Sequence, residues 1–186
     1  MNKKIFTTQD VSRMLSCDLT TVIKWVNEDK LKAYKTPGGH RRIEGPDLVD
    51  FVKKFKLPFP DELKEENRVL IVDDDPDFVS LTAGYLQKVD NIRIDSANEG
   101  FMAGEKVISF NPHVVILDVK LPGIDGYEVC RRIKEREETK GIKIVVVTAY
   151  DSPQDRRNAL ESGADVYFAK PLKSDQFVST VKKFLT

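Results

Sequence analysis

Five short runs of apolar residues recur between residues 68 and 186, and they limit the folds open to this chain more than any other feature. The runs lie at Arg68–Val72, Ile92–Ala97, Val114–Leu117, Lys143–Thr148 and Val166–Phe168. Most are continuous Val, Ile and Leu, which is typical of strands buried on both faces. Helical patterns lie between and after them, near 76–88, 100–109, 126–136, 153–162 and 174–185. The sequence therefore predicts an α/β fold, a doubly wound parallel sheet with helices on both sides.

Polar residues follow these runs directly, at the sheet edge where ligands bind in such folds. Asp73 and Asp74 follow the first run and Asp118 the third, while Thr148 ends the fourth and Lys170 follows the fifth. Clustered carboxylates repel one another unless a cation is present, and hard oxygen ligands suit Mg²⁺. A lysine and a hydroxyl complete a site for a phosphoryl group, and a carboxylate can attack phosphorus. We therefore expect a Mg²⁺-dependent aspartyl-phosphate site.

The motifs around these residues resemble the receiver domains of two-component response regulators. They are Val69–Pro76 (VLIVDDDP), Val114–Asp118 (VVILD), Leu121–Gly126 (LPGIDG), Val145–Ala149 (VVVTA), Gly163–Asp165 (GAD) and Lys170-Pro171. The resemblance spans about residues 68–186 and implies a flavodoxin-like (βα)5 fold, with a cis Lys170–Pro171 bond as the family usually has.

The resemblance also implies roles for single residues. Asp118 would be the phosphoacceptor. Asp74, Asp118 and the main-chain carbonyl of Lys120 would bind Mg²⁺ directly, and Asp73 would bind it through water. Thr148, Tyr167 and Lys170 would be the phosphoryl-binding and switch residues. Other readings stay open at three positions. Asp75 fits a helix cap, Tyr167 also fits a core aromatic, and Lys120 equally fits a solvated lysine.

Two further observations bear on enzyme activity and location. Haloacid-dehalogenase-like phosphatases carry a second Asp two residues after the first, but Asp118 is followed by Val119 and Lys120. We therefore do not expect an enzyme. Cys17 and Cys130 are far apart and are interpreted as reduced thiols, and no apolar run approaches the ~18 residues that span a membrane. A cytoplasmic location without membrane contact is expected.

The N-terminal segment shows a different pattern. Thr7-Thr8-Gln9-Asp10 is a capping box that predicts a helix to about Leu15, and Asp18 precedes a second helix, 19–28. A hairpin is predicted over 31–43 around Pro37-Gly38-Gly39, and a third helix over 47–55. These features and Thr36–Ile43 (TPGGHRRI) resemble the MerR-type or excisionase-like winged helix-turn-helix.

This resemblance implies that residues 19–28 read bases and that the hairpin grips the DNA backbone or minor groove. The implied DNA contacts are Thr20, Thr21, Lys24, Asn27, Gly38, Gly39, His40, Arg41 and Arg42, with a structural role left open for His40. Residues 1–57 hold 12 Lys and Arg against 7 Asp and Glu, a net charge of +5 that weakly favours a polyanionic partner.

The predicted organisation is a DNA-binding domain at 1–57, a proline-rich acidic linker at 58–67 and a receiver domain at 68–186. The predicted function is a DNA-binding response regulator: phosphorylation of Asp118 by a sensor histidine kinase, directly or through a phosphotransfer protein, controls transcription. Double-stranded DNA is the second expected partner, and a phosphorylation-dependent homodimer is the expected output. The alternative is a receiver-based adaptor whose small domain does not bind DNA.

Overall fold

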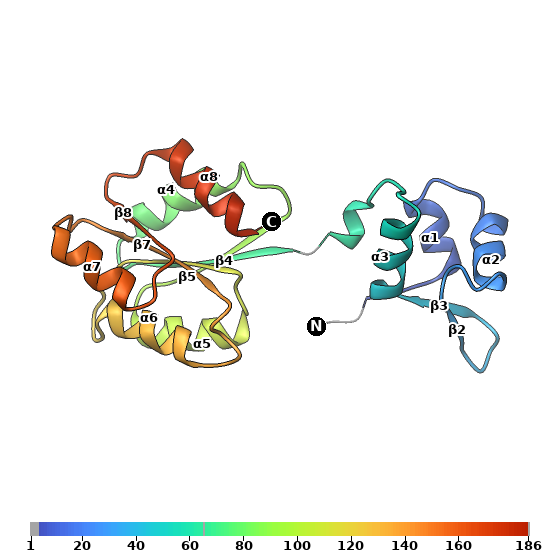
Figure 1. Ribbon diagram of the computed structural model, residues 1–186, viewed down its shortest axis with the longest axis horizontal. Coiled ribbons are helices and arrows are strands. Elements are labelled where there is room, and N and C mark those ends of the chain that lie inside the picture. Colours follow the sequence, from blue (N-terminus) through green and yellow to red (C-terminus); the bar gives the residue numbers. More distant parts are fainter. Residues whose placement is uncertain (1–3, 65, 186) are drawn as a thin grey trace. The chain divides into compact units, whose positions relative to one another are not determined.

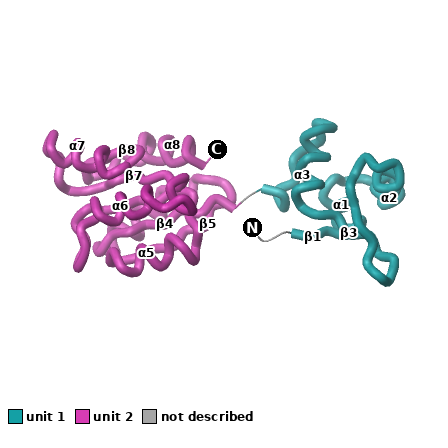
Figure 2. The backbone as a smooth tube through the Cα atoms, turned by 60° about the horizontal axis from the view of Figure 1, so that its bottom comes forward, with its two compact units in different colours: residues 1–65 teal, residues 66–186 magenta. Residues whose placement is uncertain are grey.

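The structure, a computed structural model, describes residues 4–64 and 66–185. The chain divides into two compact units, residues 1–65 and 66–186 (Figure 2). Each unit has its own hydrophobic core. Among the described residues, no helix is long and apolar enough to cross a membrane.

The C-terminal unit contains a five-stranded parallel sheet, as the apolar runs predict. Its strands are β4 (Asn67–Val72), β5 (Ile92–Ala97), β6 (Val114–Leu117), β7 (Lys143–Thr148) and β8 (Val166–Ala169). Their order is β5-β4-β6-β7-β8, so the chain goes to one side of β4 and then to the other. The switch in strand order therefore lies between β4 and β6, where this fold class opens a crevice beyond the carboxyl ends of the strands.

Helices cover both faces of this sheet (Figure 1). Helices α4 (Pro76–Leu86) and α8 (Ser174–Leu185) contribute Phe78, Leu86 and Phe177 to the core on one face. Helices α5 (Gly100–Ser109), α6 (Gly126–Glu135) and α7 (Pro153–Glu161) cover the other face. The middle strands are buried between these two layers, which is why they are apolar along their whole length.

The described residues of the N-terminal unit include three α-helices and a small antiparallel sheet. The helices are α1 (Thr8–Met14), α2 (Leu19–Asn27) and α3 (Gly45–Lys54), and the strands are β1 (Ile5–Phe6), β2 (Tyr34–Lys35) and β3 (Arg41–Glu44). The capping box at Thr7 and Asp10 forms as expected, but the Asp18 side chain makes no capping hydrogen bond to α2. Strand β1, which the sequence analysis missed, pairs with β3. It has only two residues, too few for a periodic pattern.

Part of the predicted linker, residues 58–67, packs against the N-terminal unit. Residues Asp61–Leu63 form a 3-10 turn, and Leu63 is buried in the core of the N-terminal unit. The Lys4 Nζ also donates to the Glu62 carbonyl, at 3.1 Å. Prolines and acidic residues are typical of a linker, and the sequence pattern does not show that Leu63 packs into the core of the N-terminal unit.

Candidate functional site

Three predicted site residues converge beyond the carboxyl ends of the strands. Asp73 directly follows β4, Asp118 directly follows β6, and Lys170 directly follows β8. The Lys170 Nζ donates to Asp73 Oδ2 at 2.7 Å and to Asp118 Oδ2 at 2.9 Å. One ammonium group therefore bridges two carboxylates that lie at the switch in strand order. We call these three residues the acidic crevice.

Both carboxylates of the crevice are buried, and this changes their electrostatics. Asp73 is 2% exposed and Asp118 is 7% exposed. Burial raises the pKa of the Asp73 carboxyl above its usual value, although Lys170 and the Asp75 N–H both act to lower it. Burial alone would lower the pKa of Lys170, but its hydrogen bonds to both carboxylates outweigh burial and raise it. Lys170 is therefore held as a cation, and its Nζ also lies 3.9 Å from the centre of the Phe78 ring.

The loop after Asp118 is held close to that residue. The Lys120 N–H donates to Asp118 Oδ1 at 3.0 Å, and the Gly126 N–H donates to the Val119 carbonyl at 3.0 Å. A Cβ at Gly126 would lie 2.6 Å from the Asp118 carbonyl oxygen and 2.5 Å from the Val119 Cα. Only glycine fits there without moving the backbone that carries Asp118. The sequence analysis did not assign this role to Gly126.

Two further residues of the predicted site line up along β7 and β8. Thr148 ends β7 and is fully buried, and its Oγ1 accepts a long hydrogen bond of 3.4 Å from the Tyr150 N–H. Tyr167, in β8, is 8% exposed, and its hydroxyl donates to the Tyr150 carbonyl. Burial raises the pKa of the Tyr167 phenol. The loop at Tyr150 therefore contacts both residues predicted to switch.

Other predicted residues stand apart from this cluster. The Asp74 side chain is exposed, and Lys120 is exposed with its Nζ 5.1 Å from the centre of the Tyr150 ring. The Asp75 side chain accepts hydrogen bonds from the Asp77 and Phe78 N–H groups and so caps α4, which confirms the prediction of a helix cap. The Lys170–Pro171 bond is cis, as expected.

The donor atoms of the crevice are hard oxygens, which is the chemistry that Mg²⁺ requires. Within residues 4–64 and 66–185, no three Asp, Glu, His or Cys side chains lie close enough together to hold a metal ion. Asp73 and Asp118 both contact Lys170, whereas Asp74 is exposed. By their chemistry, the carboxylates of Asp73 and Asp118 suit this ion, and Asp74 supplies a third carboxylate directly after Asp73 in the chain.

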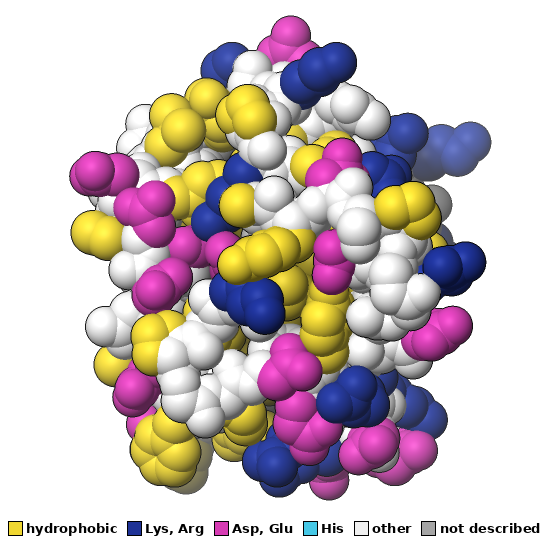
Figure 3. All heavy atoms as spheres, turned by 90° about the vertical axis from the view of Figure 1, so that its left-hand side faces the viewer, with side chains coloured by type: hydrophobic (Ala, Val, Ile, Leu, Met, Phe, Trp, Pro, Cys, Tyr) yellow, Lys and Arg dark blue, Asp and Glu magenta, His cyan; other side chains and the backbone are white. Residues whose placement is uncertain are grey.

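Figure 3 presents the end of the C-terminal unit at which the carboxyl ends of the parallel strands lie. Strand β4 runs from right to left in Figure 1, so a view from the left faces the carboxyl ends of the parallel strands. On this face basic, acidic and apolar side chains lie side by side (Figure 3). A charged ligand would therefore meet both signs of charge there.

The predicted DNA-contacting residues lie on α2 and on the hairpin between β2 and β3. Thr20 and Lys24 are exposed on α2, and Thr21 is half-buried. In the hairpin, the Gly39 N–H donates to the Thr36 carbonyl at 2.8 Å, and Gly39 has a φ of +80°, which favours glycine. Gly38 and His40 are exposed beside it.

Two of these residues contact one another. The Arg41 Nη2 donates to Asn27 Oδ1 at 2.8 Å, which links the end of α2 to β3. Arg41 is half-buried, and its Nε is enclosed without a hydrogen-bond partner. Arg42 is also half-buried and donates to the Arg41 carbonyl at 3.0 Å. Both arginines lie in β3 of the predicted hairpin, and residues 37–40 form the turn that precedes it.

The fold and the acidic crevice define the class of response regulator receivers, here preceded by a helix-turn-helix unit. Residues 69–182 match the response regulator receiver domain, and residues 5–56 match a helix-turn-helix domain. The chain belongs to the response regulator receiver family.

Known proteins similar to this chain support the same family. ResD, a transcriptional regulatory protein of Bacillus subtilis, is 36% identical over 64% of this chain and 48% of its own length. RpaA, a DNA-binding dual master transcriptional regulator of Synechocystis, is 33% identical over 63% of this chain and 48% of its own. The receiver domain of a DNA-binding response regulator (merR) from Colwellia psychrerythraea is 28% identical, with a TM-score of 0.61, over 63% of this chain and 97% of that one. The chain thus spans about half the length of these two curated relatives.

Proposed function

We propose that this chain is a DNA-binding response regulator in which phosphorylation of Asp118 controls DNA binding and transcription. One observation carries the proposal: the Asp118 carboxylate lies 2.9 Å from the Lys170 ammonium, beside Asp73, at the switch in strand order. This arrangement supplies a carboxylate nucleophile and a fixed cation within reach of it. The relatives named above are regulators of transcription, which supports a regulatory rather than an enzymatic role.

The reaction proposed is transfer from a phosphohistidine of a sensor kinase or phosphotransfer protein. An Asp118 oxygen forms the new bond to phosphorus, the P–N bond to the histidine breaks, and the imidazole nitrogen keeps that electron pair and takes a proton. The product is an acyl phosphate on Asp118. Lys170 then pairs with the phosphoryl oxygens instead of with the carboxylate alone.

The proposed cofactor is Mg²⁺, held by Asp73, Asp74, Asp118 and the main-chain carbonyl of Lys120. When bound, it neutralises charge that develops on the phosphoryl oxygens. Thr148 is proposed to donate its hydroxyl to the phosphoryl group. Because Tyr150 contacts both Thr148 and Tyr167, a movement of Thr148 is proposed to repack Tyr167.

We propose that the N-terminal unit binds double-stranded DNA through α2 and the hairpin, with Thr20, Lys24, Gly38, Gly39 and His40 at the surface. In this proposal Asn27 and Arg41 hold the hairpin against α2 and so position the contacts. Phosphorylation is proposed to favour a homodimer, which raises the effective concentration of one DNA-binding unit beside the other. The proposed location of the protein is the cytoplasm, and no step of the proposed function involves a membrane.

The test is labelling of the full chain with a small phosphodonor in the presence of Mg²⁺. We expect about one acid-stable, base-labile phosphate per chain and no sustained turnover of the donor. Asp118→Asn should abolish the label. The matched control is Asp125→Asn, because Asp125 only caps α6 and asparagine caps equally well. Label that persists in Asp118→Asn would refute the assignment.

DNA binding is tested separately, by fluorescence anisotropy of double-stranded DNA fragments selected for binding to the full chain from a random pool. Binding that weakens steeply with salt supports the proposal. If no fragment is retained even at low salt, with and without beryllofluoride, the small unit does not bind DNA and the protein is an adaptor.

A further inference from the structure

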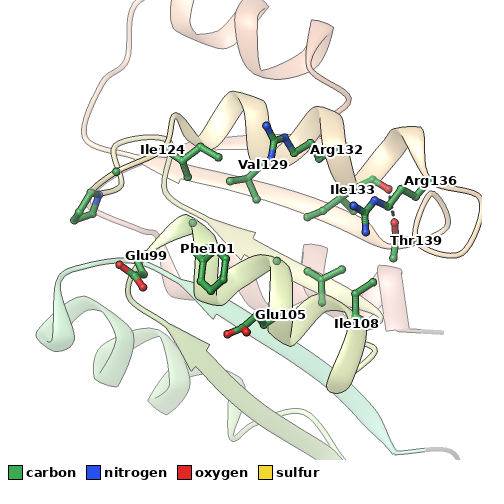
Figure 4. A pocket seen from close by; sticks show the side chains of 15 residues that line it. Glu99, Phe101, Glu105, Ile108, Ile124, Val129, Arg132, Ile133, Arg136 and Thr139 are labelled. Atoms are coloured by element: carbon green, nitrogen blue, oxygen red, sulfur yellow. Dashed lines mark hydrogen bonds between the residues drawn. The ribbon is translucent and has the colours of Figure 1, made fainter.

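A groove that the proposed function does not use lies between α5 and α6 of the C-terminal unit (Figure 4). Its volume is about 550 Å³, and no residue of the acidic crevice lines it. Its buried wall includes Val107, Val129 and Ile133. At its rim Phe101 is 74% exposed and Ile108 is 56% exposed. Exposed apolar side chains beside a groove are typical of an interaction surface.

The charges along the groove are segregated by helix. Glu99 and Glu105 line it on the side of α5, whereas Arg132 and Arg136 line it on the side of α6 (Figure 4). All four side chains are exposed. Arg132 also pairs with Glu128 of its own helix, at 2.8 Å, so Arg136 is the less compensated of the two arginines. The two helices run in the same direction, because each leads from the end of one parallel strand to the start of the next. The groove therefore has one acidic rim and one basic rim, parallel to one another.

We propose that this groove binds a second copy of this chain, face to face, about a two-fold axis that runs along the groove. That axis places α5 of each copy over α6 of the other, so each acidic rim meets a basic rim. A two-fold axis across the groove would instead place α6 over α6, with arginine facing arginine. The charge pattern thus selects one of the two symmetric arrangements.

The apolar residues fit the same arrangement. With α5 over the second copy's α6, Phe101 and Ile108 of each copy face α6 of the other beside its groove and leave solvent. An unrelated amphipathic helix could also cover the apolar wall, but nothing would then require two rims of opposite sign. This proposal does not rest on phosphorylation or on DNA binding, so it can fail without affecting either.

The first test uses charge reversal and sedimentation equilibrium of the unphosphorylated full chain. Glu105→Arg and Arg132→Glu should each raise the dimer dissociation constant by about tenfold, because each puts like charges opposite one another at two equivalent places. An equimolar mixture of the two variants should associate as tightly as the wild type, since both contacts then pair opposite charges. Lys182→Glu, on the opposite face of the sheet, is the control and should change nothing.

A second test fills the groove. Gly104 lines it, and a Cβ at Gly104 would meet no atom within 4 Å, so a side chain can be introduced there without a clash at its Cβ. Gly104→Trp should abolish the dimer, while Gly104→Ala should keep it, and circular dichroism should show that both variants are folded.

Three results would each overturn the proposal. They are a wild-type chain that stays monomeric at every concentration, a dimer insensitive to Glu105→Arg and to Gly104→Trp, and a mixture of the two charge variants that remains monomeric. The last result would point to an occupant other than a second copy.

Discussion

Asp165 shows how a single carboxylate can join three elements. Its Oδ2 accepts from the Lys134 Nζ at 2.8 Å and from the Ile144 N–H at 2.9 Å, and its Oδ1 accepts from the Lys143 Nζ at 2.8 Å. Burial alone would raise the pKa of Asp165, but these three donors outweigh it and hold the pKa below its usual value. The residue thus ties α6 and β7 to the start of β8.

We predict that Asp165→Asn lowers the free energy of unfolding of the C-terminal unit by about 2 kcal/mol at pH 7. Because the pKa is depressed in the folded state, this contribution is present above the unfolded pKa of about 3.9 and is lost as the pH falls below it. The difference between wild type and variant should therefore shrink at pH 3. This difference in free energy of unfolding is measured by denaturation followed by circular dichroism. Tryptophan fluorescence would not serve, because Trp25 lies in the N-terminal unit. The exposed Asp90→Asn is the control, and an equal loss there would contradict the prediction.

Gly126 is the residue on which the backbone geometry at Asp118 depends. We predict that Gly126→Ala costs about 2–3 kcal/mol of stability, because its Cβ would contact backbone atoms that cannot move aside cheaply. It should also slow phosphoryl labelling of Asp118. Gly84→Ala is the matched control: it lies in α4 with open space around its Cβ and should be neutral or stabilising by up to about 1 kcal/mol. Normal stability and labelling in Gly126→Ala would show that the loop is not constrained.

At the scale of elements, the hairpin of the N-terminal unit depends on α2. Arg41 in β3 and Asn27 at the end of α2 form the side-chain hydrogen bond that joins them. The two short strands share few ladder bonds, because β2 contains only two residues. The position of the hairpin relative to α2 should therefore be sensitive to this contact.

We predict that Asn27→Ala speeds amide hydrogen exchange in residues 34–44, because Arg41 loses its acceptor. Asn27→Asp keeps an acceptor and adds a charge, so exchange there should match the wild type or be slower. Unchanged exchange in Asn27→Ala would mean that packing alone holds the hairpin.

At the scale of the whole molecule, charge is divided between the two units. The chain has 30 basic and 30 acidic residues, yet residues 1–57 carry a net charge of +5. The proposed binding of DNA by this basic unit is therefore expected to weaken as salt is added.

We predict that Lys24→Ala, which removes an exposed cation of α2, lowers affinity about equally for all DNA sequences. It should also reduce the slope of log affinity against log salt by about one, as for the loss of one phosphate contact. Anisotropy titrations at several salt concentrations measure both. Lys182→Ala, in the other unit, should leave the slope unchanged, and a loss confined to one DNA sequence would instead indicate a base contact.

Much of the fold could be predicted because its strands and helices leave local patterns of apolar and polar residues in the sequence. The five apolar runs matched the five strands, and Asp73, Asp118 and Lys170 could be placed together because parallel strands end at one edge. Local patterns did not reveal strand β1, the burial of Leu63 or the contact of Asn27 with Arg41. Each of these depends on a surface or a partner supplied by a distant part of the chain.

The sequence by itself determined the strands, their helices and the residues that follow each strand, because side-chain burial on two faces leaves a continuous apolar run. Only the tertiary structure decided which side chains meet. Lys170 bridges Asp73 and Asp118 across separations of 97 and 52 residues, whereas Asp74, the immediate neighbour of the buried Asp73, is exposed. The physical reason is that hydrogen bonds and burial act through space, whereas the sequence pattern records only what lies nearby along the chain.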